Sequence, residues 1–95
     1  MSERITSQPL PNGYFPIRII VRTGLSERFI EDSMQRHEII IIQAPKPTGN
    51  QYEEAIIAVP FADKEMLRID FNIFASEMET RYGRNMEFRM ESAEI

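Results

Sequence analysis

The sequence predicts an α+β domain whose elements follow one another as strand, helix, strand, strand, helix, strand. Two observations carry this prediction: four segments have the alternating or continuous apolar pattern of strands, and two have apolar residues at helical spacing. With 95 residues the chain is long enough for one domain and too short for two. Residues 1–13 are mostly polar, contain two prolines and end in Asn12-Gly13. We therefore expect a flexible N-terminal arm over 1–13 and a single α+β domain over 14–95.

The first strand is predicted over 14–22, where side chains alternate between two faces with the period of a strand. The more apolar face consists of Phe15, Ile17, Ile19 and Val21. The other face consists of Arg18, Ile20 and Arg22. Its two arginines indicate that this second face is half exposed. After a break at Thr23-Gly24, Ser26 is a favourable N-cap for a short helix that ends around Arg36-His37.

The second and third strands are predicted as a hairpin. Four consecutive isoleucines at 39–42 disfavour a helix and place large side chains on both faces of a sheet. Residues 44–50 contain two prolines and a glycine, so we expect a long loop there. Residues 52–61 alternate again, and the face opposite the more apolar one consists of Glu54, Ile56 and Ala58.

The second helix has the clearest pattern: Asp63 is its predicted N-cap, and Gly83 is expected to stop it after Tyr82. Its core-facing stripe consists of Leu67, Phe71, Phe74, Met78 and Tyr82. Three further apolar residues lie apart from that stripe, namely Met66, Ile69 and Ile73. They are either a second contact strip or part of a wide buried face, and we favour the buried face. Residues 84–91 then alternate as a last strand.

This order of elements is that of the ferredoxin-like plait, a βαββαβ fold with a four-stranded antiparallel sheet and two helices on one face. Right-handed crossovers place both helices together and make the first and third strands central. The main rival is the same set of elements with the last strand paired at another edge.

In a plait the sheet face that lacks helices is open, and the alternation predicts an apolar patch there, ringed by arginines and glutamates. The predicted partner-binding residues are Arg18, Ile20, Arg22, Ile40, Ile42, Glu54, Ile56 and Arg89. Ile39 and Ile41 would replace the two isoleucines of the second strand if that strand had the opposite orientation. Such a patch is typical of a protein contact. The alternative is that these isoleucines are scattered and partly covered by the N-terminal arm.

Residues that support catalysis or metal binding are scarce. The chain has no cysteine, its four glycines are isolated, and no phosphate-binding glycine motif occurs. His37 is the only histidine and follows a helix end, where we expect a structural role. No second histidine and no nearby carboxylate pair is predicted to join it in a metal site. We therefore expect no catalytic residue, no metal and no cofactor.

Charge and composition narrow the class of partner. Acids outnumber bases 15 to 11, and the net charge of -4 without any basic cluster argues against nucleic acid. No apolar run approaches the roughly 18 residues of a membrane span. A cysteine-free sequence favours a reducing, cytoplasmic location.

These observations predict a non-enzymatic protein-interaction or regulatory module that acts through the open sheet face. Its partner is expected to be a second copy in a homodimer, another protein, or both, and the prediction includes an acidic inhibitor of a partner protein. The alternative is a small-molecule-binding or cofactor-independent enzymatic domain of ferredoxin-like type, with Arg22, Tyr52 and His37 as candidate residues.

Overall fold

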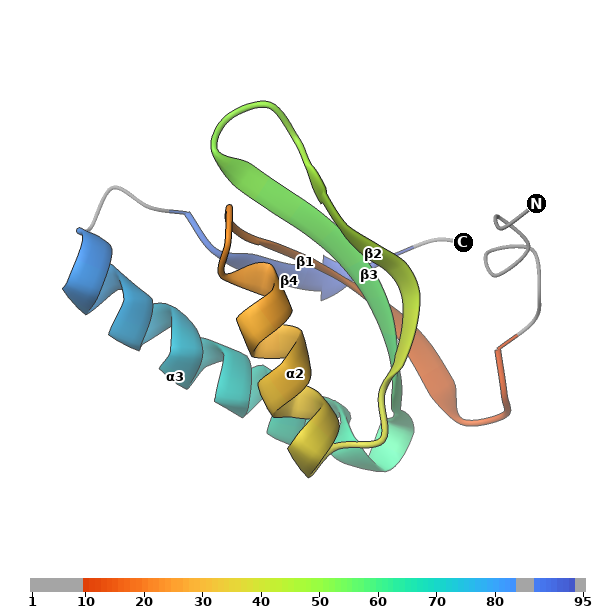
Figure 1. The fold of residues 1–95 in the computed structure, drawn as a ribbon. Helices are drawn as coiled ribbons and strands as arrows, with labels where there is room; N and C mark the ends of the chain where they lie inside the picture. Colours follow the sequence, from red (N-terminus) through yellow and green to blue (C-terminus); the bar gives the residue numbers. More distant parts are fainter. Residues whose placement is uncertain (1–9, 84–86, 94–95) are drawn as a thin grey trace.

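The computed structural model describes residues 10–83 and 87–93. Its elements are β1 (Tyr14–Arg22), α2 (Ser26–Arg36), β2 (Ile40–Pro47), β3 (Tyr52–Pro60), the 3-10 helix η1 (Phe61–Asp63), α3 (Lys64–Tyr82) and β4 (Arg89–Ser92). The four strands form one antiparallel sheet in the order β2-β3-β1-β4, and both helices lie on the same side of it (Figure 1). The prediction of an α+β chain with a four-stranded antiparallel sheet and two helices is confirmed, with the first and third strands central.

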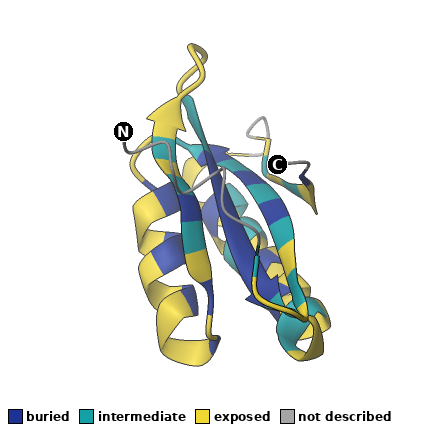
Figure 2. Cartoon of the chain, turned by 90° about the vertical axis from the view of Figure 1, so that its right-hand side faces the viewer, coloured by how far each residue is buried: buried dark blue, intermediate teal, exposed yellow. Residues whose placement is uncertain are grey.

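The main core lies between the sheet and the two helices, as the buried stretches in Figure 2 indicate. Alternate residues of β1 and β3 form one side of this core. Apolar residues of both helices form the other side, including Phe29 and Ile30 of α2 and Leu67, Phe71 and Met78 of α3. Phe29 of α2 contacts two phenylalanines of α3, with ring centroids 5.1 Å from Phe71 and 5.2 Å from Phe74. Edge-to-face and tilted aromatic contacts of this kind add to the burial of apolar area. They join the two helices over the centre of the sheet.

The second strand is longer than the sequence predicted. Residues 44–47 belong to β2, so the predicted loop over 44–50 is wrong over its first half, and the hairpin tip is residues 48–51. The physical reason is the position of β2 at the edge of the sheet, where a proline need not donate a hydrogen bond to a neighbouring strand. The pairing of β2 with β3 shifts register twice, between Ile41 and Gln43 and between Gln43 and Lys46.

The start of α2 is bound by a side chain distant in sequence. The helix begins at Ser26, and Leu25 occupies the N-cap position without a side-chain cap bond, so the prediction of Ser26 as N-cap is wrong. Instead, the Glu53 carboxylate on β3 accepts hydrogen bonds from the Gly24 N–H, at 3.2 Å, and from the Ser26 hydroxyl. A carboxylate there complements the positive end of the helix dipole.

The second helix follows its prediction closely at both ends. Asp63 occupies the N-cap position, although its side chain makes no cap hydrogen bond, and the helix ends at Tyr82. Gly83 follows with φ of 110°, a conformation that side chains other than glycine rarely adopt. The expectation that Met66, Ile69 and Ile73 lie in a wide buried face is wrong, because they are 53%, 48% and 54% exposed.

We predict that Glu53→Ala lowers the free energy of unfolding by about 1–2 kcal/mol, because it removes the acceptor at the start of α2. Glu38→Ala is the matched control, since Glu38 is exposed and lies outside the helices and strands, and surface changes of this kind usually stay within about 0.5 kcal/mol. Urea unfolding followed by circular dichroism measures both variants. Equal losses in the two would rule out this role of Glu53 at the start of α2.

Candidate functional site

The strand register fixes which residues face away from the helices. Residues directly opposite each other on antiparallel strands share a face, and the register pairs Arg18 with Ile56, Ile20 with Glu54, and Arg22 with Tyr52. On the edge strand, Ile40 lies opposite Ala58, and Ile42 packs with Ile56. Ile39 and Ile41 belong to the helix-side core instead. The structure therefore selects Ile40 and Ile42 for the face without helices, and that face has two different halves.

One half is covered by the chain itself. Ile42, Ile56, Ala58 and Ala93 form a second buried cluster, with exposed fractions between 0% and 8%, and Leu10 and Tyr14 pack against it. The end of β4 is held there because the Ala93 N–H donates a hydrogen bond to the Pro16 carbonyl, at 3.1 Å. The expected open isoleucine patch is therefore partly filled from within. Residue 10 of the predicted arm takes part in this cover, whereas residues 1–9 lie outside the described residues.

An ion-pair network crosses the middle of this face. Arg18 Nε lies 2.9 Å from Glu54 Oε2, and Arg18 Nη1 lies 3.6 Å from Glu91 Oε2. The network joins the central strands β1 and β3 to the edge strand β4. These side chains are about one quarter to one half exposed, so the ion pairs add little stability. Their effect is to hold the charged side chains of this face in fixed positions.

The other half of the face is a shallow hollow of about 500 Å³. It is bounded by β1, the hairpin tip, β3 and the segment that enters β4. The residues that line it are Ile20, Thr48, Asn50, Tyr52, Glu54, Glu87 and Arg89. The hollow thus combines the apolar Ile20 and the ring of Tyr52 with two carboxylates, one guanidinium and two uncharged hydrogen-bonding side chains.

Hydrogen bonds to Tyr52 hold the walls of the hollow. The Glu87 N–H donates to the Tyr52 hydroxyl at 2.5 Å, which attaches the segment before β4 to β3. At the hairpin tip, the Thr48 N–H and Thr48 hydroxyl both donate to the Tyr52 carbonyl, at 2.9 and 3.2 Å. One residue therefore connects two walls of the hollow.

The eight residues predicted for this face have different environments. Ile20, Glu54 and Arg89 line the hollow, while Ile42 and Ile56 are buried in the covered half. Arg18 holds the ion-pair network, and Ile40 is partly exposed on the edge strand. Arg22 turns to the end of α3, with its guanidinium 5.6 Å from the centre of the Tyr82 ring. That these residues bind a partner stays a prediction.

A second cluster, which sequence reasoning missed, surrounds His37. Its Nε2 lies 2.8 Å from Asp70 Oδ2, its Nδ1 lies 3.6 Å from Asp63 Oδ2, and Arg36 Nη1 lies 3.5 Å from Asp70 Oδ1. The sequence did not predict that two carboxylates approach His37, and the expectation that no carboxylate pair joins His37 in a metal site stays a prediction. The signal was present, because Asp63 and Asp70 are seven residues apart and so lie on one side of α3. Within residues 10–83 and 87–93, no group of three such side chains is arranged to hold a metal ion.

The candidate enzymatic residues do not converge. Tyr52 begins β3, whereas His37 contacts Asp63 just beyond the end of that strand. Eight residue steps of about 3.3 Å separate the ends of β3 by roughly 26 Å. A shared reaction centre of Tyr52 and His37 is therefore not formed.

Comparison with protein-family models, with curated proteins and with solved structures found no match for this chain. In the part of the chain that the structure describes, neither helix has the length and apolar character needed to cross a membrane.

We predict that Asp70→Ala lowers the free energy of unfolding by about 1–3 kcal/mol, because it leaves the buried His37 ring without its close partner. Asp32→Ala is a matched control. Asp32 also contacts Arg36, at 3.4 Å, but both side chains are about half exposed, and such pairs contribute at most about 1 kcal/mol. Thermal and urea unfolding measure both variants, and a larger loss in Asp32→Ala would contradict the assignment.

We further predict that Leu10→Ala uncovers the buried half of the face. Removing a partly buried leucine side chain should cost about 1–2 kcal/mol and increase the fluorescence of a dye that binds apolar surface. Pro11→Ala is the control, because Pro11 is the exposed neighbour. Unchanged stability and dye binding in Leu10→Ala would mean that residue 10 does not cover the cluster in solution.

Proposed function

We propose that this chain is a ferredoxin-like plait that acts as a non-enzymatic protein-interaction module through the face of its sheet without helices. The observation that carries the proposal is the hollow around Ile20 and Tyr52, with Glu54, Glu87 and Arg89 at its rim. The βαββαβ order and the β2-β3-β1-β4 arrangement support the fold name.

The make-up of the hollow favours a polypeptide partner. A pocket for a small molecule usually encloses most of its ligand within mainly apolar walls. Here the walls are shallow and mostly polar, and charges of both signs stand at the rim. Mixed rim charges set the orientation of a protein partner and reject wrong ones, while the apolar centre supplies the contact area.

The edges of the sheet are poor alternatives for such a contact. Strand β2 carries Pro45 and Pro47 and is paired irregularly with β3. Strand β4 has only four residues, among them the charged Arg89 and Glu91. Prolines, irregular pairing, short length and charge are the features by which proteins prevent a strand from adding to an edge. Recognition is therefore proposed for the face.

A partner other than a second copy has the better support. The homodimer hypothesis placed Ile42 and Ile56 at the centre of a shared interface, and both are already buried within the chain. The net charge of -4 favours a partner with a basic surface, which includes a regulatory role as an acidic inhibitor. The absence of cysteine fits a reducing compartment, so we place this role in the cytoplasm.

The proposal predicts site-specific crosslinking in cells. A photoreactive phenylalanine analogue replacing Asn50, at the rim of the hollow, should crosslink one discrete partner. The same analogue replacing Asn72, an exposed asparagine on α3, should not. Adding Glu87→Arg should reduce the Asn50 crosslink at least tenfold, since a positive charge at the rim repels a partner with a basic surface.

Several outcomes would contradict the proposal. Crosslinks of the chain to itself at position 50 would favour the homodimer, and identical products at both positions would mean that the hollow is not selective. Stabilisation by a metabolite that is lost in Ile20→Glu would favour the small-molecule alternative. Circular dichroism of each variant verifies that it is folded.

A further inference from the structure

Asn12 and Gly13 are the central residues of the turn that leads into β1 (Figure 1). The Tyr14 N–H donates a hydrogen bond to the Pro11 carbonyl, at 3.2 Å, and this bond closes the turn. Gly13 has φ of 86°, as the third residue of a type II turn requires. Both central residues are exposed, and a side chain added at Gly13 would begin in open space, with nothing within 4 Å beyond its chain neighbours. The dipeptide is therefore open to solvent.

This dipeptide holds two groups that can react with each other. The backbone nitrogen of Gly13 can attack Cγ of the Asn12 side-chain amide and close a five-membered succinimide ring. A side chain on the second residue hinders such an attack, and glycine has none. Within the described part of the chain, the Gly13 N–H donates to no backbone carbonyl. Neither a side chain nor a backbone hydrogen bond therefore holds the attacking nitrogen back.

We propose that Asn12 is a site of spontaneous deamidation. The Gly13 nitrogen loses its proton and bonds to Asn12 Cγ, the bond from Cγ to the amide nitrogen breaks, and ammonia leaves with that proton. Water then opens the ring at either of its two carbonyls. One opening gives aspartate, and the other gives isoaspartate, in which the main chain runs through Cγ. The reaction needs only water, and it does not depend on the proposed role of the hollow.

Isoaspartate changes the geometry of the turn. It lengthens the main chain between Asn12 and Gly13 by one carbon atom, so the hydrogen bond that closes the turn loses its spacing. The Gly13 carbonyl also accepts a hydrogen bond from the Phe61 N–H, at 2.6 Å, which ties the turn to the start of η1. Leu10 lies just before this turn and packs against the buried cluster of the sheet face. Deamidation therefore loosens the cover of that cluster as the protein ages.

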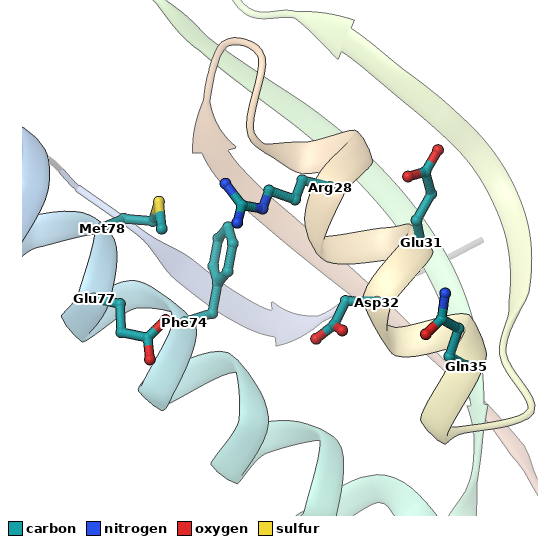
Figure 3. Close-up of a pocket in the computed structure, with 7 residues that line it drawn as sticks. All are labelled: Arg28, Glu31, Asp32, Gln35, Phe74, Glu77 and Met78. Carbon is teal, nitrogen blue, oxygen red and sulfur yellow. The ribbon is translucent and has the colours of Figure 1, made fainter.

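The experiment incubates the full-length protein at mildly alkaline pH and follows each side-chain amide by peptide mapping and mass spectrometry. Two exposed amides of the same chain serve as internal controls. Asn72 lies within α3 and is followed by Ile73, and Gln35 projects from α2 beside the groove between the helices (Figure 3). We expect Asn12 to convert at least about tenfold faster than either control, because only Asn12 precedes a residue without a side chain.

Asn12→Gln is the matched variant, because it keeps the amide but cannot close the five-membered ring. The unchanged chain should accumulate isoaspartate at position 12, measured by isoaspartate-specific methylation, and should bind more of a dye that reports apolar surface. The variant should do neither during the same incubation. Conversion of Asn12 no faster than that of Asn72 would overturn the proposal. Isoaspartate at position 12 without any rise in dye binding would overturn the loosening of the cover by Leu10.

Discussion

The nine-residue antiparallel ladder between β1 and β3 is the constraint on which the rest of the structure depends. Its register, from Tyr14 opposite Pro60 to Arg22 opposite Tyr52, decides which of the central pairs face the helices. A slip by one residue would move each side chain to the other face. If β3 slipped in this way, its odd-numbered residues would leave the core, and Glu54 would take the place of Ala55 beneath the helices. The apolar alternation thus specifies the register, and the register specifies both surfaces.

Acidic side chains at two distant points hold α2 on this sheet. Glu53 on β3 meets the start of α2, and Asp70 on α3 meets its end through His37. Helix ends leave backbone groups without partners inside the helix, and an eleven-residue helix has little stability of its own. Acids that look like ordinary surface charge in the sequence therefore have structural roles. Glu54 and Glu87, by contrast, line the hollow on the face of the sheet without helices.

The spacing of apolar residues along the sequence predicted the features that depend on neighbouring residues. It did not predict the features that depend on contacts between residues distant in the sequence. The bounds of α3 followed from Asp63 and Gly83, and the orientation of β1 followed from its alternation. The continuation of β2 through Pro45 could not be inferred, because composition alone does not reveal that a strand lies at an edge. The burial of Ile42 and Ile56 was weighed only as an alternative, since it requires Leu10 to fold back over the sheet. The contact of Glu53 with Ser26 crosses 27 residues, so no local pattern could reveal it.

The two halves of the sheet face are linked by the same strands, which explains how a small domain can keep the hollow ordered. Ile56 in the covered half and Glu54 in the hollow are successive outward residues of β3, so burial of the first fixes the backbone that carries the second. Tyr52, the next outward residue, is fixed in turn by Glu87 and Thr48. A partner that meets walls already ordered loses less conformational entropy on binding. The cover formed by Leu10 and Tyr14 therefore supports the hollow beside it, although neither residue lines it.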